Sequence, residues 1–221
     1  MNINQYIDHT NLKPTATKND IVKLCKEAKD HNFYAVCVNG SYVKVAKESL
    51  GTDQVKVAAV IGFPLGAMST EAKIFEAKQA IDDGADEIDM VIHIGKLLEG
   101  DHQYVENEIS QIKKAIGNKI LKVILENCYL TPGLIKQASE LSINAKADFI
   151  KTSTGFGTDG ATAEDILLMK EIVDDQIQIK AAGGIKDIKT AKKFIHFGAT
   201  RLGTSSGVTL VTEGTSSKND Y

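Results

Sequence analysis

The stretch ADFIKTSTG, residues 147–155, holds a lysine inside an apolar run with the composition of a buried β-strand. Residues 147–152 are predicted to form the strand, and the small and hydroxyl residues after them are typical of a loop. Burying an unpaired charge is costly, so Lys151 requires either a partner or a chemical task. The lysine lies near the carboxyl end of its strand, which is where α/β barrels place their active sites.

Three further apolar strands share this feature. Lys180 lies in IQIKAA, Asp89 in DEIDMVI and Lys122 in ILKVILE. Alternate residues of a strand share one face, so Lys122 is expected to point the same way as Ile124 and Glu126. If that face lines the interior of a barrel, the charges converge there. The alternative is that each charge pairs separately with a structural carboxylate at a strand end.

Short β-rich runs alternate with amphipathic helical stretches along the chain. Val, Ile and Ala dominate the runs, as expected of parallel strands buried on both faces. Apolar residues recur at helical spacing within 105–116, and Thr131, Thr162 and Asp187 are candidate helix N-caps. The predicted strands cover residues 7–10, 33–38, 55–61, 86–92, 120–126, 147–152, 177–182 and 200–204.

This alternation predicts the α/β class and leaves a closed barrel or an open, doubly wound sheet. No G-x-G-x-x-G follows the first clear strand, which disfavours the dinucleotide-binding sheet. The length of 221 residues fits one (β/α)8 TIM barrel, and we expect a single domain over residues 1–211. Residues 212–221, TEGTSSKNDY, are polar and are predicted to be a mobile tail.

Composition excludes several function classes. The net charge of −3, the 6% aromatic content and the absence of Trp indicate no nucleic-acid partner. No apolar run approaches the ~18 residues of a transmembrane helix, and the N-terminus lacks a signal-peptide pattern, so no membrane association is expected. The three cysteines, which show no C-x-x-C spacing, are predicted to be reduced thiols of a cytoplasmic protein.

Two lysines brought together have a definite chemical use. An ordinary lysine has a pKa of ~10.4, so only about one in a few thousand is a neutral nucleophile at pH 7. We predict that the Lys180 ammonium and partial burial lower the pKa of Lys151. The neutral amine then attacks a carbonyl to form an imine, an electron sink suited to aldol cleavage. Asp89, with Lys180 and a water molecule, would suit the proton relay.

Two glycine-rich loops predict a phosphate site. The segment GGIKD, 183–187, follows the Lys180 strand, and GTSSG, 203–207, follows the last strand. Barrels commonly bind phosphate in the loops after strands seven and eight, where backbone N–H groups and a helix N-terminus meet the anion. Gly155 could contribute a further N–H. Ordinary tight turns are the alternative interpretation of both loops.

No metal or cofactor is expected. The histidines lack the H-x-H or H-x-x-x-H spacing of a zinc site. Cys37 ends a predicted strand and could line the pocket, although a buried, inert thiol is the favoured interpretation. The five histidines are His9, His31, His93, His102 and His196.

Several segments together resemble the deoxyribose-phosphate aldolase family, from about residue 7 to residue 211. K-T-S-T-G-F followed by G-A-T is a highly specific signature. The sequence departs from the family at Asp159, where glycine is more frequent, and at Ala182, where serine is also common. The segments are DHTNLKPTAT (8–17), AVCVN (35–39), GFPLG (62–66), GADEIDMVI (84–92), FIKTSTGFGTDGAT (149–162), IKAAGGIKD (179–187) and RLGTSS (201–206).

The resemblance implies reversible cleavage of 2-deoxy-D-ribose 5-phosphate to D-glyceraldehyde 3-phosphate and acetaldehyde, in deoxyribonucleoside catabolism. It implies Lys151 as the imine-forming lysine, Lys180 as the group that perturbs its pKa, and Asp89 as the relay partner. We expect a homo-oligomer, either a dimer or a tetramer. The phosphate site would be Gly155, Gly184, Ser205 and Ser206, and secondary candidates are Asp8, Cys37, Lys122 and Tyr221.

Three alternative functions remain open at this point. A different Schiff-base barrel, such as a transaldolase-like enzyme, would use the same Lys151 chemistry on another substrate. A phosphate-binding barrel isomerase would share the Gly-Gly loop but would need no imine. A non-catalytic phosphosugar-binding protein is the weakest alternative, because it has little reason to bury two lysines in strands.

Overall fold

Eight parallel strands close into one barrel in the computed structural model, which describes residues 2–216 and the side chains of 2–212. The closed order, β1 to β8 and back to β1, confirms the (β/α)8 TIM barrel. All eight predicted strands are present, with ends that differ from the prediction by at most two residues. The strands are β1 Ile7–Asn11, β2 Ala35–Asn39, β3 Lys56–Ile61, β4 Glu87–Val91, β5 Ile120–Ile124, β6 Phe149–Lys151, β7 Gln178–Ala182 and β8 Arg201–Thr204.

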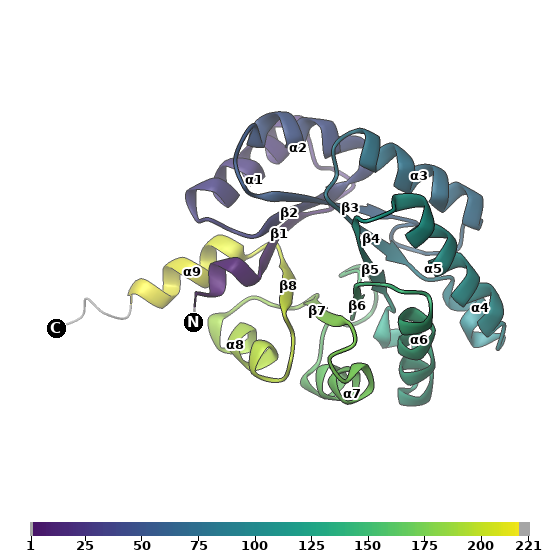
Figure 1. Cartoon of the computed structure of the whole chain (residues 1–221). Helices are drawn as coiled ribbons and strands as arrows, with labels where there is room; N and C mark the ends of the chain where they lie inside the picture. The colour runs from purple at the N-terminus through teal and green to yellow at the C-terminus, as the bar shows by residue number, and fades with distance from the viewer. Residues whose placement is uncertain (1, 217–221) are drawn as a thin grey trace.

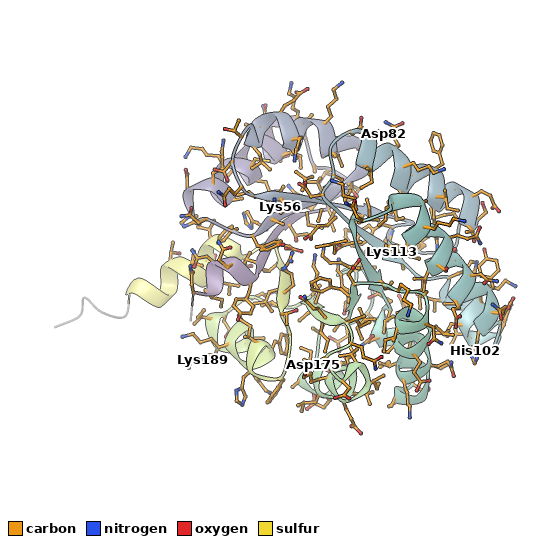
Figure 2. The ribbon with its side chains drawn as sticks, in the orientation of Figure 1. Lys56, Asp82, His102, Lys113, Asp175 and Lys189 are labelled. Atoms are coloured by element: carbon orange, nitrogen blue, oxygen red, sulfur yellow. The ribbon has the colours of Figure 1, made fainter. Side chains whose placement is uncertain are left out.

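The helices form a ring outside the strands (Figure 1). The three predicted N-caps are confirmed, since Thr131, Thr162 and Asp187 each accept a backbone N–H of the first helical turn. Figure 2 shows Asp82 and Lys189 at the outer edge of this ring. The helices are α1 Lys18–Asp30, α2 Val43–Leu50, α3 Thr70–Asp82, α4 Ile94–Leu98, α5 His102–Ile116, α6 Pro132–Asn144, α7 Ala163–Val173, α8 Ile188–His196 and α9 Gly207–Ser216.

The domain boundary predicted after Val211 falls inside α9, because this helix continues to Ser216. Residues 212–216 of the predicted tail are therefore helical. Helix α9 starts directly after the loop that follows β8, so it continues the alternation of strand and helix. The remaining predicted tail, including Tyr221, lies outside the described residues.

The two faces of the strands have different chemistry. One face packs against the helices and is apolar, with Val36, Ile88 and Ile150 fully buried there. Burial of such a side chain contributes roughly 2 kcal/mol, so this outer layer supplies the main stabilisation of the barrel. The other face lines the interior and carries the charged residues that the sequence analysis singled out. The side chains that stabilise the barrel therefore lie on the outer face of the strands, and the charged side chains lie on the inner face.

Strand register places the interior charges beside one another. Lys151 on β6 pairs in register with Lys180 on β7, and Lys180 pairs with Arg201 on β8. Asp89 on β4 is opposite Lys122 on β5. Because adjacent strands lie about 4.8 Å apart, side chains on the same face of neighbouring strands come into direct contact.

A buried ion pair stands apart from the barrel interior. Lys73 Nζ, on α3, donates to Glu108 Oε2 of α5 at 2.8 Å and to the Val91 carbonyl at 2.8 Å. Both side chains are fully buried. Burial lowers the pKa of Lys73, and Glu108 only partly offsets this effect. The pair fixes two helices to the carboxyl end of β4, the strand that carries Asp89.

We predict that Lys73→Met lowers the free energy of unfolding by about 3 to 5 kcal/mol, because the Glu108 carboxylate stays buried without its cation. Urea unfolding monitored by circular dichroism measures the change. The matched control is the double variant Lys73→Met/Glu108→Leu, which should recover most of the loss. A double variant as unstable as the single one would show that packing, and not charge, is responsible.

Candidate active site

A cavity of about 550 Å³ lies at the carboxyl end of the barrel. Its walls come from the segments after β1, β6, β7 and β8, together with one face of α1. Lys151 is the strand lysine that reaches this wall, and 2% of its surface is exposed. A concave site with one buried ammonium in its wall is the expected setting for a covalent nucleophile.

Asp89 holds two lysines with one oxygen atom. Lys151 Nζ donates to Asp89 Oδ2 at 2.9 Å, and Lys180 Nζ donates to the same oxygen at 2.8 Å. The two ammonium groups are therefore no further apart than the sum of these distances. Asp89 and Lys180 are fully buried, so Lys151 lies between them and the cavity. The structure thus brings together the three residues predicted as the catalytic group.

Lys122 faces carboxylates and not the cavity. Its Nζ lies 2.6 Å from Asp89 Oδ1, 2.5 Å from Glu87 Oε2 and 3.8 Å from Asp8 Oδ2. The side chain is fully buried. This geometry assigns Lys122 to holding Asp89, because its ammonium donates toward carboxylates inside the barrel.

Glu126 does not share the Lys122 face, which corrects the alternation expected from the sequence. Strand β5 ends at Ile124, and Glu126 adopts a left-handed backbone with φ +57°. Its carboxylate accepts the Thr154 backbone N–H at 3.0 Å and the Thr154 hydroxyl. The two loops that follow β5 and β6 are tied together by these bonds. The sequence alone does not indicate this role, because the apolar pattern predicts a strand that continues to residue 126.

Arg201 closes a ring of alternating charges. Its Nη1 donates to Asp8 Oδ1 at 2.9 Å and to Glu87 Oε2 at 3.1 Å. Asp8 in turn accepts from Lys180. Each cation of the ring bonds the carboxylates on both sides of it. In order, the members are Lys180, Asp8, Arg201, Glu87, Lys122 and Asp89.

The ring holds three cations and three carboxylates, so its formal charges cancel. Lys151 is a fourth cation, attached to the ring through Asp89. Glu87 and Arg201 were not selected from the sequence. Glu87 lies two residues before Asp89 and therefore on the same strand face, which is the signal that could have found it. Arg201 begins its strand and gave no comparable pattern.

Asp89 and Lys180 stay charged because each of them faces groups of the opposite charge. Burial would raise the pKa of Asp89, but Lys122, Lys151 and Lys180 outweigh this effect and hold the pKa well below its ordinary value. Burial would likewise lower the pKa of Lys180, but Asp8 and Asp89 outweigh it and raise the pKa above its ordinary value. Lys180 is therefore a permanent cation beside Lys151 at neutral pH.

All four residues predicted to bind phosphate line the same cavity as Lys151. Gly155 and Gly184 have φ of +87° and +77°, and a Cβ built on either one would meet no atom within 4 Å. Their backbones therefore face open space, as an anion site requires. Ser205 and Ser206 lie on the opposite loop, directly before the N-terminus of α9.

Cys37 lies inside the barrel in a small apolar cluster with Leu12, Ala58 and Val60. It is fully buried, and burial raises the pKa of its thiol. A thiol with a raised pKa is a weak nucleophile, so its surroundings suit packing better than chemistry.

Two further properties concern residues 2–216. The side chains of residues 2–212 include no group of three or more His, Cys, Asp or Glu arranged to hold a metal ion. None of the helices in this part of the chain has the length and apolar character of a bilayer-spanning segment.

Comparison with known proteins agrees with this geometry. The DeoC/LacD aldolase family matches residues 3–210. A deoxyribose-phosphate aldolase of Thermococcus gammatolerans is 56% identical over 215 residues, covering 96% of each chain, and one of Deinococcus radiodurans is 51% identical over 214 residues, covering 97% of each. A tetrameric deoxyribose phosphate aldolase structure from Aeropyrum pernix superposes with a TM-score of 0.86 at 32% identity, covering 97% of this chain and 91% of the other.

The barrel and its buried lysines thus define an aldolase, an enzyme of the aldehyde-lyase class. The chain belongs to the DeoC/LacD aldolase family.

We predict that Asp8→Asn destabilises the protein in a pH-dependent way. Burial would raise the pKa of Asp8, but Lys180 and Arg201 outweigh it and hold the pKa below its ordinary value of 3.8. A carboxylate with a depressed folded-state pKa adds stability that is present above the unfolded pKa and is lost below it. The free energy of unfolding of the variant should therefore be about 3 kcal/mol below that of wild type at pH 7. This difference should narrow below about pH 4.

Urea unfolding of both proteins at pH 7, 5, 4 and 3 measures this difference. A gap that stays constant down to pH 3 would contradict the assignment of Asp8 as an ionised member of the ring.

Proposed function

We propose that this aldolase reversibly cleaves 2-deoxy-D-ribose 5-phosphate to D-glyceraldehyde 3-phosphate and acetaldehyde, through an imine on Lys151. The observation that carries the proposal is the position of Lys151, in the cavity wall with Asp89 and Lys180 buried behind it. The names of the relatives support the same substrate.

The reaction begins when the neutral Lys151 amine attacks C1 of the open-chain sugar. The carbinolamine then loses water and gives the protonated imine. A general base takes the proton of the C3 hydroxyl, the C2–C3 bond breaks, and its electron pair moves to the imine nitrogen as an enamine. D-glyceraldehyde 3-phosphate, which carries C3 to C5, leaves. Protonation of the enamine carbon and addition of water then release acetaldehyde and restore the amine.

The buried groups have separate tasks in this sequence. Lys180 places a fixed positive charge beside the nucleophile, which disfavours a second ammonium on Lys151. Asp89 stabilises the iminium cation that forms on the same nitrogen. A water molecule ordered by Asp89 and Lys180 carries the proton between the C3 hydroxyl and the enamine carbon. The iminium is the electron sink, so the proposed reaction requires neither a metal ion nor a cofactor.

The glycine and serine loops bind the substrate phosphate in this proposal. Gly155 and Gly184 offer backbone N–H groups, Ser205 and Ser206 offer hydroxyl groups, and the N-terminus of α9 adds a favourable dipole. Binding of the phosphate in the cavity that Lys151 also lines orients C1 of the sugar toward the amine.

The wider setting is also part of the proposal. We place the reaction in deoxyribonucleoside catabolism, in the cytoplasm, where the free thiols of Cys25, Cys37 and Cys128 would stay reduced. We propose a homo-oligomer, which the tetrameric relative supports. Sedimentation velocity tests the oligomeric state, and a monomer at micromolar concentration would refute this part.

The imine is tested by reductive trapping with acetaldehyde and cyanoborohydride, followed by peptide mass mapping. We expect one reduced adduct, on Lys151. The matched control is Lys151→Arg, which retains a cation but cannot form an imine. It should fold and lose at least about a thousandfold in activity, since the covalent route is closed. Appreciable cleavage by this variant, or an adduct on another lysine, would refute the mechanism.

The phosphate site is tested with Ser206→Asp and its neutral counterpart Ser206→Asn. Aspartate and asparagine are both good helix N-caps. The backbone carbonyl of Ser206 accepts the N–H of Leu210 in the first turn of α9, so both variants should fold. We expect the carboxylate to lower kcat/KM for 2-deoxyribose 5-phosphate by at least about tenfold through repulsion, with little change for 2-deoxyribose. An equal loss of kcat/KM on both substrates would show that the phosphate binds away from Ser206.

A further inference from the structure

Glu87 and Arg201 form the part of the charge ring that is remote from the cavity. Neither lines the cavity that Lys151 reaches, and they are 1% and 4% exposed. The Arg201 guanidinium carbon lies 3.5 Å from the centre of the Tyr34 ring, on the barrel interior. The chemistry described above assigns no task to this pair, although burying it requires compensating interactions.

The net charge of the barrel interior indicates a role for Glu87 and Arg201. With all seven interior groups ionised, the interior carries one net positive charge, and that charge disappears when Lys151 loses its proton. Among the described side chains, those of residues 2–212, Lys151 forms its ion pair with Asp89 alone, and it shares that carboxylate oxygen with Lys180. Each ring cation, in contrast, contacts at least two carboxylates. Lys151 is consequently the interior cation with the fewest carboxylate contacts, and its charge is the one that the neutral ring does not balance.

We propose that Glu87 and Arg201 are positioning residues that set the protonation of Lys151 from a distance, by completing a charge-neutral ring. This inference rests on the proposed function, because it concerns the amine that forms the imine. The other charged or titratable groups facing Lys151 on the barrel interior are the remaining ring members and Cys37. Those on the cavity walls are His9, Lys13, Asp20, Lys23, Glu27 and Lys186.

Arg201→Met and Glu87→Gln change the ring charge in opposite directions. Methionine removes one positive charge, so the Lys151 ammonium becomes more stable. Glutamine removes one negative charge, so that ammonium becomes less stable. The glutamine can keep the Glu87 geometry, because the cations bond Oε2 and Oε1 has no hydrogen-bond partner among the described residues.

The experiment measures the pH at which imine formation with acetaldehyde reaches half its maximal rate, by cyanoborohydride quench and mass spectrometry. We expect this midpoint to rise by roughly one pH unit in Arg201→Met and to fall by a similar amount in Glu87→Gln. A unit charge about 10 Å away, at an effective dielectric constant of about 20, has an effect of this size. The double variant should return to within about 0.3 units of wild type, because its ring is neutral again.

Arg201→Lys is the matched control. It keeps the charge but loses the forked geometry, so the midpoint should stay in place even where the melting temperature falls. Opposite shifts that cancel in the double variant cannot arise from a structural role alone. If Arg201→Met fails to fold, Glu87→Gln and Arg201→Lys still provide the comparison.

Unchanged midpoints, or shifts of the same sign in both single variants, would overturn the inference while leaving the imine mechanism intact. A wild-type protein that traps no acetaldehyde would instead overturn the proposed function itself.

Discussion

The Asp89 carboxylate is the contact on which the rest of the interior depends. One of its oxygens accepts from Lys151 and Lys180, and the other accepts from Lys122. The three ammonium groups all lie within hydrogen-bond distance of this carboxylate and would repel one another strongly without it. Asp89 is itself fully buried and would be protonated without these cations. The three lysines therefore require the buried carboxylate, and the carboxylate requires the lysines to stay ionised.

Mutual dependence of this kind explains why the cluster extends beyond the reacting atoms. Asp8 balances Lys180, Glu87 balances Lys122, and Arg201 joins the two carboxylates. Every member of the ring then has at least two opposite charges nearby, which is the condition under which ion pairs remain tolerable in a low-dielectric interior. The apolar outer layer between strands and helices supplies the stability that the interior gives up.

The chain length and the lack of a G-x-G-x-x-G motif favoured the closed barrel over an open sheet. Residue periodicity predicted the α/β class and the eight strands, since Val, Ile and Ala runs such as that at Ile150 mark strands buried on both faces. It also predicted the proximity of Lys151, Lys180 and Asp89, because charges in parallel strands meet only on a shared interior face. It failed at Glu126, where a single left-handed residue ends the alternation. It also missed Arg201, because the importance of that residue arises from partners more than a hundred positions away, which no local pattern records.

The bond between Glu126 and Thr154 has a geometric consequence for substrate length. Lys151 and Gly155 are only four residues apart, and the anchor at Thr154 holds the intervening chain against the neighbouring loop. The nucleophilic nitrogen and the glycine proposed to bind phosphate are therefore the two ends of a stiff spacer. Under the proposed function, such a spacer would work as a molecular ruler, which accepts a carbonyl and a phosphate separated by a fixed number of carbons. A longer sugar phosphate would have to buckle to place both groups at once.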